Sequence, residues 1–147
     1  MALPNVSSTW YFLDGGTSTG NSGYISSFNP NTRTADVRLR PVTADGYGLP
    51  VLYHVKPHAR AVFVVRTYIQ RAGLAAVVEV NRQIAAQEVR YAVTGAVSLV
   101  DGTPGTTRVW GLADGYNGHG FKEWIILFNP RVSEAIVRLR LIRLVAG

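Results

Sequence analysis

The sequence predicts an all-β protein, an antiparallel β-sandwich, and three observations lead to this fold class. About ten short stretches with β-strand character are separated by turn signals roughly every 8 to 12 residues, which is typical of sandwiches. No stretch has the 3.6-residue periodicity of an amphipathic helix. A strand-loop-hairpin block near the N-terminus occurs again one hundred residues later, so part of the fold is expected to be built twice.

The first block opens with a strand and a glycine-rich loop. Residues 9–13, "TWYFL", are aromatic and β-branched, and Asp14 and Gly15 follow them as a turn signal. The carboxylate of Asp14 can accept backbone N–H bonds in such a turn. After the loop, residues 24–28 form the next expected strand.

The block continues with a turn and an alternating strand. Asn29 and Pro30 end the preceding strand because proline has no N–H to donate to a β-ladder. Residues 35–42 then alternate between apolar and polar side chains, which predicts that Val37 and Leu39 face the core.

Four further strands are expected between the two copies of the block. Pro57-His58-Ala59 separates the first pair, and Asn81-Arg82-Gln83 separates the second pair as a predicted hairpin turn. The expected strands are residues 50–57, 60–69, 75–81 and 84–93.

The two blocks, residues 10–42 and 110–142, are identical at thirteen of thirty-three positions without a gap. Such agreement indicates a duplication. The apolar stretches of the second block must be buried on the same chain or on another molecule, since exposed apolar surface costs about 25 cal/mol per Å². We expect burial on the same chain. The repeated motif residues include Trp10 and Trp110, Asp14 and Asp114, Gly15 and Gly115, Asn29 and Asn129, and Pro30 and Pro130.

The repeat allows two divisions of the chain. In the first, residues 1–8 are a tail and 9–147 form a single sandwich, with the two blocks around central strands in 50–93. In the alternative, residues 9–107 are one full repeat and 108–147 open a second repeat.

Composition excludes some classes of site and disfavours others. The chain has no cysteine, which excludes disulfides and thiolate metal sites. Its net charge is +6, but the arginines are scattered singly, which argues against a nucleic-acid partner. No apolar run approaches the roughly 18 residues that span a bilayer. The first residues do not have the pattern of a signal peptide, so we expect a cytoplasmic protein or a piece without its leader.

No pattern of catalytic or metal-ligating residues is found, so we expect a non-enzymatic protein without metal or cofactor. His54 and His58 lie in an extended segment, where a spacing of four puts them about 13 Å apart, too far for one ion. Glu79 and Glu88 are expected to pair with the nearby Arg82 and Arg90.

Aromatic side chains beside flexible loops are the candidate binding residues. Exposed rings with polar neighbours suit sugars or protein partners, whereas the repeated Trp10 and Trp110 are expected in the core. The candidate binding residues are Tyr11, Tyr116, Phe121 and Trp124.

The order of these phrases resembles a bacterial tandem repeat of cell-surface and secreted proteins. That family opens with Trp-Tyr-Phe-Ala-Glu-Gly, followed by a glycine-rich loop and a strand ending in Asn-Pro; here the phrases are "WYFLDG", "GTSTGNSG" and "YISSFNP". The resemblance covers residues 10–144 and departs at Asp14 and Asp114, where the family has Glu. It implies an immunoglobulin-like sandwich with a spacer, adhesion or assembly role.

Together these observations predict a structural or assembly module of a bacterial surface or secreted protein, self-associating by strand addition. Its partners would be copies of itself, neighbouring repeats or a surface glycan. The alternative function is a carbohydrate-binding or adhesive module. The expected location is extracellular or at the cell surface, with the cytoplasm as the alternative.

Overall fold

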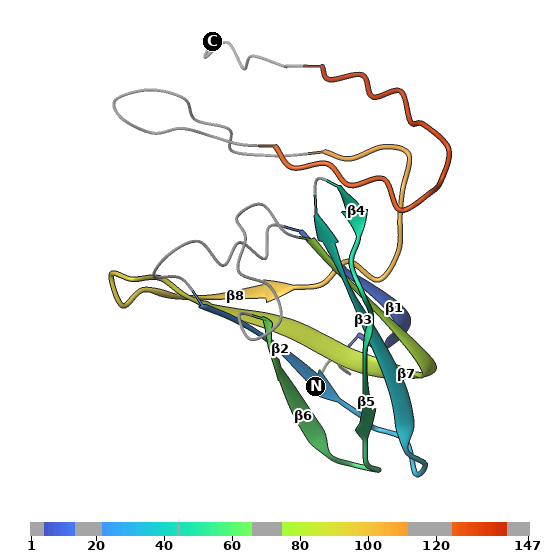
Figure 1. Ribbon diagram of the computed structural model, residues 1–147, viewed down its shortest axis with the longest axis vertical. Coiled ribbons are helices and arrows are strands. Elements are labelled where there is room, and N and C mark those ends of the chain that lie inside the picture. The colour runs from blue at the N-terminus through green and yellow to red at the C-terminus, as the bar shows by residue number, and fades with distance from the viewer. Residues whose placement is uncertain (1–4, 14–21, 44, 66–74, 112–124, 141–147) are drawn as a thin grey trace, which may run out of the picture.

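The computed structural model describes residues 5–13, 22–43, 45–65, 75–111 and 125–140. Within these ranges the chain forms eight antiparallel strands and is all-β (Figure 1). Their bounds are β1 Ser7–Phe12, β2 Ser22–Phe28, β3 Ala35–Thr43, β4 Gly46–Tyr47, β5 Val51–Val55, β6 Arg60–Val64, β7 Ala75–Tyr91 and β8 Val97–Asp101.

The long strand β7 organises the sheet. Its first half pairs with β1 and β3, and its second half pairs with β2 and β8. β3 also pairs with β4 and β5, and β2 pairs with β6. The strands thus form one open antiparallel sheet that folds through β7 into two layers, an arrangement consistent with the expected β-sandwich (Figure 1).

The hairpin expected at residues 81–83 is wrong, because β7 runs through this segment without a break. A tight hairpin needs residues with positive φ, which Asn-Gly or Asp-Gly pairs supply. Neither glycine nor positive φ occurs here. Along β1, the partner on β7 jumps from Ile84 opposite Ser7 to Glu79 opposite Thr9, so a bulge takes the place of the turn.

The core lies between the two layers and follows the predicted alternation. On β3, Val37 and Leu39 are buried while Asp36 and Arg38 are exposed, as the period of two predicts. Trp10 is also buried, and its Nε1 donates a hydrogen bond of 2.9 Å to the carbonyl of Ile84. The buried apolar cluster comprises Trp10, Phe12, Ile25, Ala35, Val37, Leu39, Val55, Phe63, Val65, Ala76, Val78, Ile84 and Ala86.

The Asn-Pro turn joins β2 of one layer to β3 of the other. Asn29 is fully buried, and its side-chain amide donates to the carbonyls of Arg33, Val55 and Lys56 at 2.8, 2.9 and 3.2 Å. Its Oδ1 accepts from the backbone N–H of Asn31 at 3.0 Å. The asparagine therefore ties this turn to the end of β5, which explains why a polar side chain is tolerated in the interior.

Residues 125–140 of the second block form no β-ladder. They run in extended form beside the end of the sandwich near β4 (Figure 1). The local turn of the first block is nevertheless repeated: the Asn129 amide donates to the carbonyl of Ser133 at 2.7 Å, and the Arg131 N–H donates to Asn129 Oδ1 at 3.1 Å. These bonds match those that Asn29 makes with Arg33 and Asn31. The duplicated sequence thus forms the same turn without the surrounding sheet.

We expect Gly102→Ala to destabilise the protein by about 1–3 kcal/mol, the usual cost of overpacking a core. A Cβ at Gly102 would lie 2.8 Å from Phe12 Cζ and 3.0 Å from Trp10 Cε3, and both rings are held in the core. Urea denaturation measures the loss. Gly105→Ala is the matched control, since an added Cβ meets nothing within 4 Å there; equal effects of the two substitutions would contradict the packing argument.

Candidate functional site

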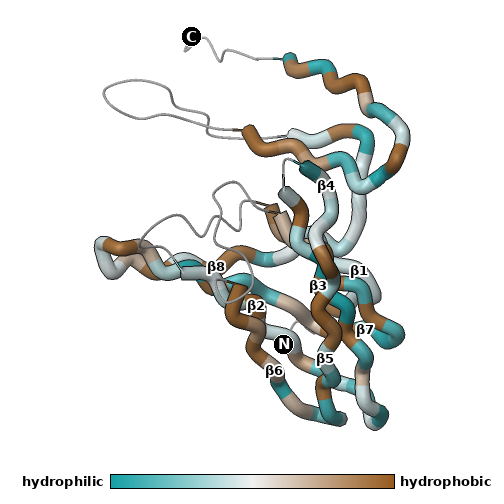
Figure 2. Tube along the Cα trace, in the orientation of Figure 1, coloured by the Kyte–Doolittle hydropathy of each residue, from teal (hydrophilic) through white to brown (hydrophobic). Residues whose placement is uncertain are grey.

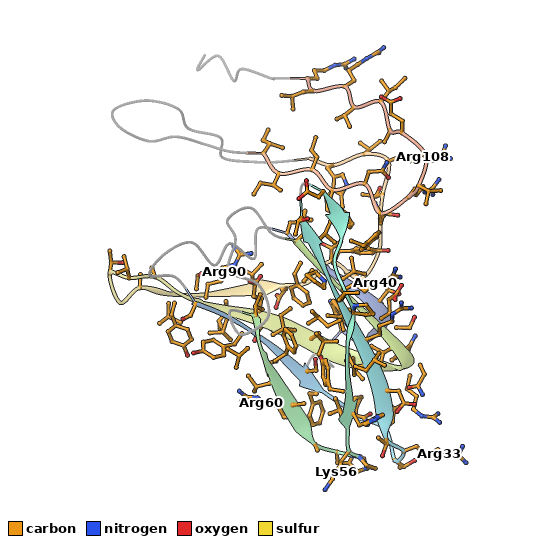
Figure 3. The ribbon with its side chains drawn as sticks, viewed as in Figure 1. Arg33, Arg40, Lys56, Arg60, Arg90 and Arg108 are labelled. Carbon is orange, nitrogen blue, oxygen red and sulfur yellow. The ribbon has the colours of Figure 1, made fainter. Side chains whose placement is uncertain are left out.

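The best-defined group of surface side chains lies on the outer side of the layer formed by β1, β3, β4 and the first half of β7. We call Tyr11, Arg40, Tyr47 and Glu79 the tyrosine face. Arg40 donates through Nε to Glu79 Oε2 at 3.1 Å and through Nη2 to Glu79 Oε1, so the ion pair is bidentate. Figure 3 labels Arg40 on β3. Its guanidinium also lies 4.8 Å from the centre of the Tyr47 ring, a cation–π distance.

The electrostatics of this face favour an apolar partner. The hydrogen bond with Glu79 raises the pKa of Arg40 above its usual value, against the lowering effect of burial. Burial raises the pKa of Tyr47, partly offset by the nearby Arg40 cation. At neutral pH the tyrosine is therefore uncharged and the arginine charge is compensated by Glu79. What remains available to a partner is aromatic surface and the Tyr47 hydroxyl.

A segment of the second block already contacts this face. The Phe128 ring lies 6.2 Å from the Tyr11 ring and 6.2 Å from the Tyr47 ring, and it meets Tyr47 edge-on at 83°. The Tyr47 hydroxyl donates to the carbonyl of Pro130 at 3.3 Å. The contact thus joins β1, β4 and the second Asn-Pro turn.

Of the four candidate binding residues, the described structure includes only Tyr11, which is half-buried on the tyrosine face. Tyr116, Phe121 and Trp124 lie outside the described residues. The sequence indicates Tyr11 as a binding residue and Glu79 as a member of an ion pair, but it does not indicate Arg40 or Tyr47.

The repeated motif residues have different surroundings in the two blocks. Trp10 and Asn29 are buried as part of the sandwich, whereas Trp110 and Asn129 are exposed. The core position expected for Trp110 is therefore wrong in this structure. The half-buried Pro30 and Pro130 follow the two asparagines. Asp14, Gly15, Asp114 and Gly115 lie outside the described residues.

The expected ion pairs are partly different from those observed. Glu88 is buried and accepts a bond of 2.9 Å from Arg90, as expected, but within one strand. Glu79 pairs with Arg40 across two strands and not with Arg82. The Arg82 Nε instead donates to the carbonyl of Thr34.

His54 lies 2.8 Å from Asp36 through its Nδ1 atom, on the exposed outer side of β3 and β5. Among the described residues, no three His, Asp or Glu side chains gather closely enough to hold a metal ion. In that same part of the chain, no helix is long and apolar enough to cross a membrane.

A second candidate site is a cavity of about 350 Å³ where β1, β2, β7 and the end of β8 meet. The ring of Phe28 is 41% exposed at this cavity, and the amide of Gln87 donates to Asp101 at 2.9 Å. The lining residues are Asn5, Trp10, Ser26, Phe28, Ala85, Ala86, Gln87, Asp101 and Gly102.

Comparison with known proteins places the fold among solved structures. No protein-family model and no curated protein sequence matches the chain. The structure is similar to that of Thermotoga maritima 1070, with a TM-score of 0.58 and 19% identity over 69% of this chain and 99% of that chain. It is also similar to the Anabaena sensory rhodopsin transducer, with a TM-score of 0.51 and 15% identity over 58% of this chain and 98% of that chain. In both cases, the similarity extends over nearly the whole of the other chain but only part of this one.

Proposed function

We propose that this chain is a non-enzymatic structural or assembly module that associates through its second repeat block, residues 108–147. One observation carries the proposal: equivalent side chains are buried in the first block and exposed in the second. Ile25, Val37 and Leu39 are at most 1% exposed. Their counterparts Ile125, Val137 and Leu139 are 41%, 59% and 63% exposed.

The second block also exposes large apolar side chains that have polar counterparts in the first block, namely Ile126, Leu127, Val132 and Ile136. Figure 2 shows these apolar stretches along the segment beyond the sandwich. Fully burying one such side chain contributes about 1.5–3 kcal/mol. Several together can offset the cost of association, so a partner surface is the physical explanation for their presence.

The duplication supports the same proposal. Two hydrogen bonds of Asn129 reproduce those of Asn29, so the two blocks share the conformation of this turn, as a second copy of an immunoglobulin-like repeat would require. We therefore favour the division into one full repeat at residues 9–107 and the opening of a second at 108–147. The partner is another copy or a neighbouring repeat, and the proposed setting is a bacterial cell surface or secreted assembly.

Light scattering of the full chain tests the proposal. We expect an oligomer that is lost when residues 108–147 are deleted, because the deletion removes the exposed apolar segment. The deletion variant should keep a cooperative unfolding transition, since β1 to β8 end at Asp101. A full-length chain that stays monomeric at all concentrations would contradict the assembly role.

The alternative function is carbohydrate binding, and the cavity beside Phe28 is the observation that favours it. An exposed ring next to the side chains of Asn5, Gln87 and Asp101 combines an apolar face with hydrogen-bonding groups, as sugars require. Trp10 lines this cavity, so a bound glycan would change the tryptophan fluorescence. A glycan array without binding, together with unchanged fluorescence, would remove this alternative and leave the assembly role untouched.

A further inference from the structure

The second block does not fit the place that the first block occupies in the sandwich. Ser27 is fully buried, with its Oγ 3.1 Å from the Tyr53 hydroxyl, whereas the second block has Leu127 at this position. A leucine there would overfill the core and leave the tyrosine hydroxyl without this bond.

A second mismatch lies beside a buried carboxylate. A Cβ added at Gly23 would lie 3.3 Å from Glu88 Oε1, and the second block has Glu123 at the equivalent position. A glutamate there would put a second negative charge next to Glu88. Both mismatches argue against an exchange in which the second block of one copy replaces the first block of another.

Residues 125–128 of the second block are apolar on both faces, and residues 134–140 have one apolar face, formed by Ala135, Val137 and Leu139, and one mainly charged face that includes Ile136. Ser26 and Asp36, which point away from the core in the first block, are replaced by Ile126 and Ile136. Strands with apolar side chains on both faces are buried on both faces. Residues 125–128 therefore need contacts on both faces, and residues 134–140 need them on one face.

The tyrosine face of the same chain contacts the outer face of the second block through one ring, that of Phe128, while Ile126 and Ile136 on that face stay 43% and 100% exposed. Phe28, the counterpart of Phe128, is exposed on the outer side of β2, so Phe128 belongs to the outer face of the second block. This ring contacts Tyr11 and Tyr47. The counterparts of the core residues, Ile125, Val137 and Leu139, stay exposed and need a cover from elsewhere.

We propose that the second block pairs with the second block of a second copy of the chain, in a dimer with two-fold symmetry that brings the exposed Val137 and Leu139 of both copies together on one apolar face. Residues 134–140 of the two copies pair antiparallel, with Val137 opposite Val137 of the second copy. The inference rests on the proposed assembly function and specifies its partner and register.

Charge complementarity and the length of the paired stretch together favour this register. With Val137 at the two-fold axis, Glu134 of each copy lies opposite Arg140 of the other, and Ala135 lies opposite Leu139. Opposite charges in directly facing positions stabilise a strand pair, and like charges destabilise it.

The neighbouring registers are less favourable. Centring the pair on Arg138 or Leu139 places arginines opposite one another. Centring it on Ile136 also places Glu134 opposite Arg138, but the last residues of the strand then lie opposite the turn at 131–133. Pairing about Val137 uses the whole stretch from Glu134 to Arg140.

The paired blocks form a small apolar cluster. In the first block, the Asn-Pro turn places Ile25 of β2 and Leu39 of β3 in one core. The same turn in the second block links residues 125–128 to 134–140, and two copies together supply two such sets of side chains. An identical patch on both partners is what a two-fold interface requires.

Disulfide trapping in the full chain tests the register, because the protein has no cysteine of its own. We expect Val137→Cys to form a disulfide-linked dimer under mild oxidation, since the two Cα atoms face each other within the range of about 4.4–6.8 Å that a disulfide spans. In Leu139→Cys the two thiols are offset by four positions, about 13 Å, and no comparable cross-linking is expected. Both positions are exposed outside the sandwich, so neither variant disturbs the core.

Charge reversal gives an independent readout. Glu134→Arg and Arg140→Glu should each weaken dimerisation about tenfold, because each turns two facing opposite-charge pairs into like-charge pairs. The variant that combines Glu134→Arg with Arg140→Glu should restore the dissociation constant of the original chain. If either residue only supported the structure of its own copy, combining the two substitutions would not restore it.

The outcomes separate this inference from the function on which it rests. An oligomer that requires residues 108–147, but in which Val137→Cys cross-links no faster than Leu139→Cys, overturns the two-fold pairing and leaves the assembly role intact. A full-length chain that is monomeric at all concentrations overturns both.

Discussion

Replacing Trp10 with alanine is expected to lower the free energy of unfolding by about 3–5 kcal/mol, the cost of removing a buried aromatic side chain. Trp10 is 3% exposed and packs in the core between the two layers. Its Nε1 also donates to the carbonyl of Ile84, at the point where β7 passes from one layer to the other. Urea denaturation followed by circular dichroism measures the loss.

The duplicated tryptophan supplies the matched control. Trp110 is 59% exposed, so Trp110→Ala should change the free energy of unfolding by less than about 0.5 kcal/mol. Trp10→Phe should lie between the two, because phenylalanine keeps most of the apolar volume but cannot donate to the Ile84 carbonyl. Equal losses for the two tryptophans would mean that the second block is packed into the core of the monomer, contrary to the structure.

The elements that could be predicted from sequence are those with local signals. The alternation along residues 35–40 fixed which side chains of β3 face the core, and Asn29 with Pro30 marked the end of β2. The sequence predicts two strands in place of β7 because Asn81-Arg82-Gln83 is polar and resembles a turn. The strand continues there because the side chains of Asn81 and Arg82 both bond to neighbouring segments. Asn81 Oδ1 accepts a hydrogen bond from the backbone N–H of Asp36 at the start of β3, and Arg82 Nε donates one to the carbonyl of Thr34 in the β2–β3 turn.

The tyrosine face could not be predicted because its members are distant in sequence. Arg40 and Glu79 become neighbours only when β3 pairs with β7, and Phe128 approaches Tyr11 only when the second block lies beside the sandwich. No local pattern signals any of these contacts. Tyr11 can be predicted because it is an aromatic residue beside a glycine-rich loop, which is a property of the sequence alone.

The second block shows that sequence identity specifies a turn more strongly than a strand. The Asn129 turn needs only residues within its own five-residue segment, and it forms. Strand pairing needs partners far away in sequence, and the described residues of this chain supply such partners only to the first block. The same amino acids at Val37 and Val137 therefore have opposite environments.

Replacing Asn29 with alanine is expected to destabilise the protein by about 3 kcal/mol. The substitution removes the donor for three backbone carbonyls, and the bond to that of Val55, at the end of β5, is buried. Leaving a buried polar group unsatisfied costs about 1–3 kcal/mol. The Asn31 N–H, which donates to Asn29 Oδ1, loses its acceptor as well. Thermal and urea unfolding of the variant measure the effect.

Two further substitutions separate hydrogen bonding from volume. Asn29→Asp keeps the shape of the side chain but has no N–H group, so a carboxylate would face three carbonyl oxygens; we expect a loss at least as large as that of alanine. Asn129→Ala removes the same local turn bonds at an exposed site and should cost less than about 1 kcal/mol. A small loss in the free energy of unfolding for Asn29→Asp would show that the three carbonyls find other donors. Burial of the turn, and not the Asn29 amide, would then hold β2 and the end of β5 together.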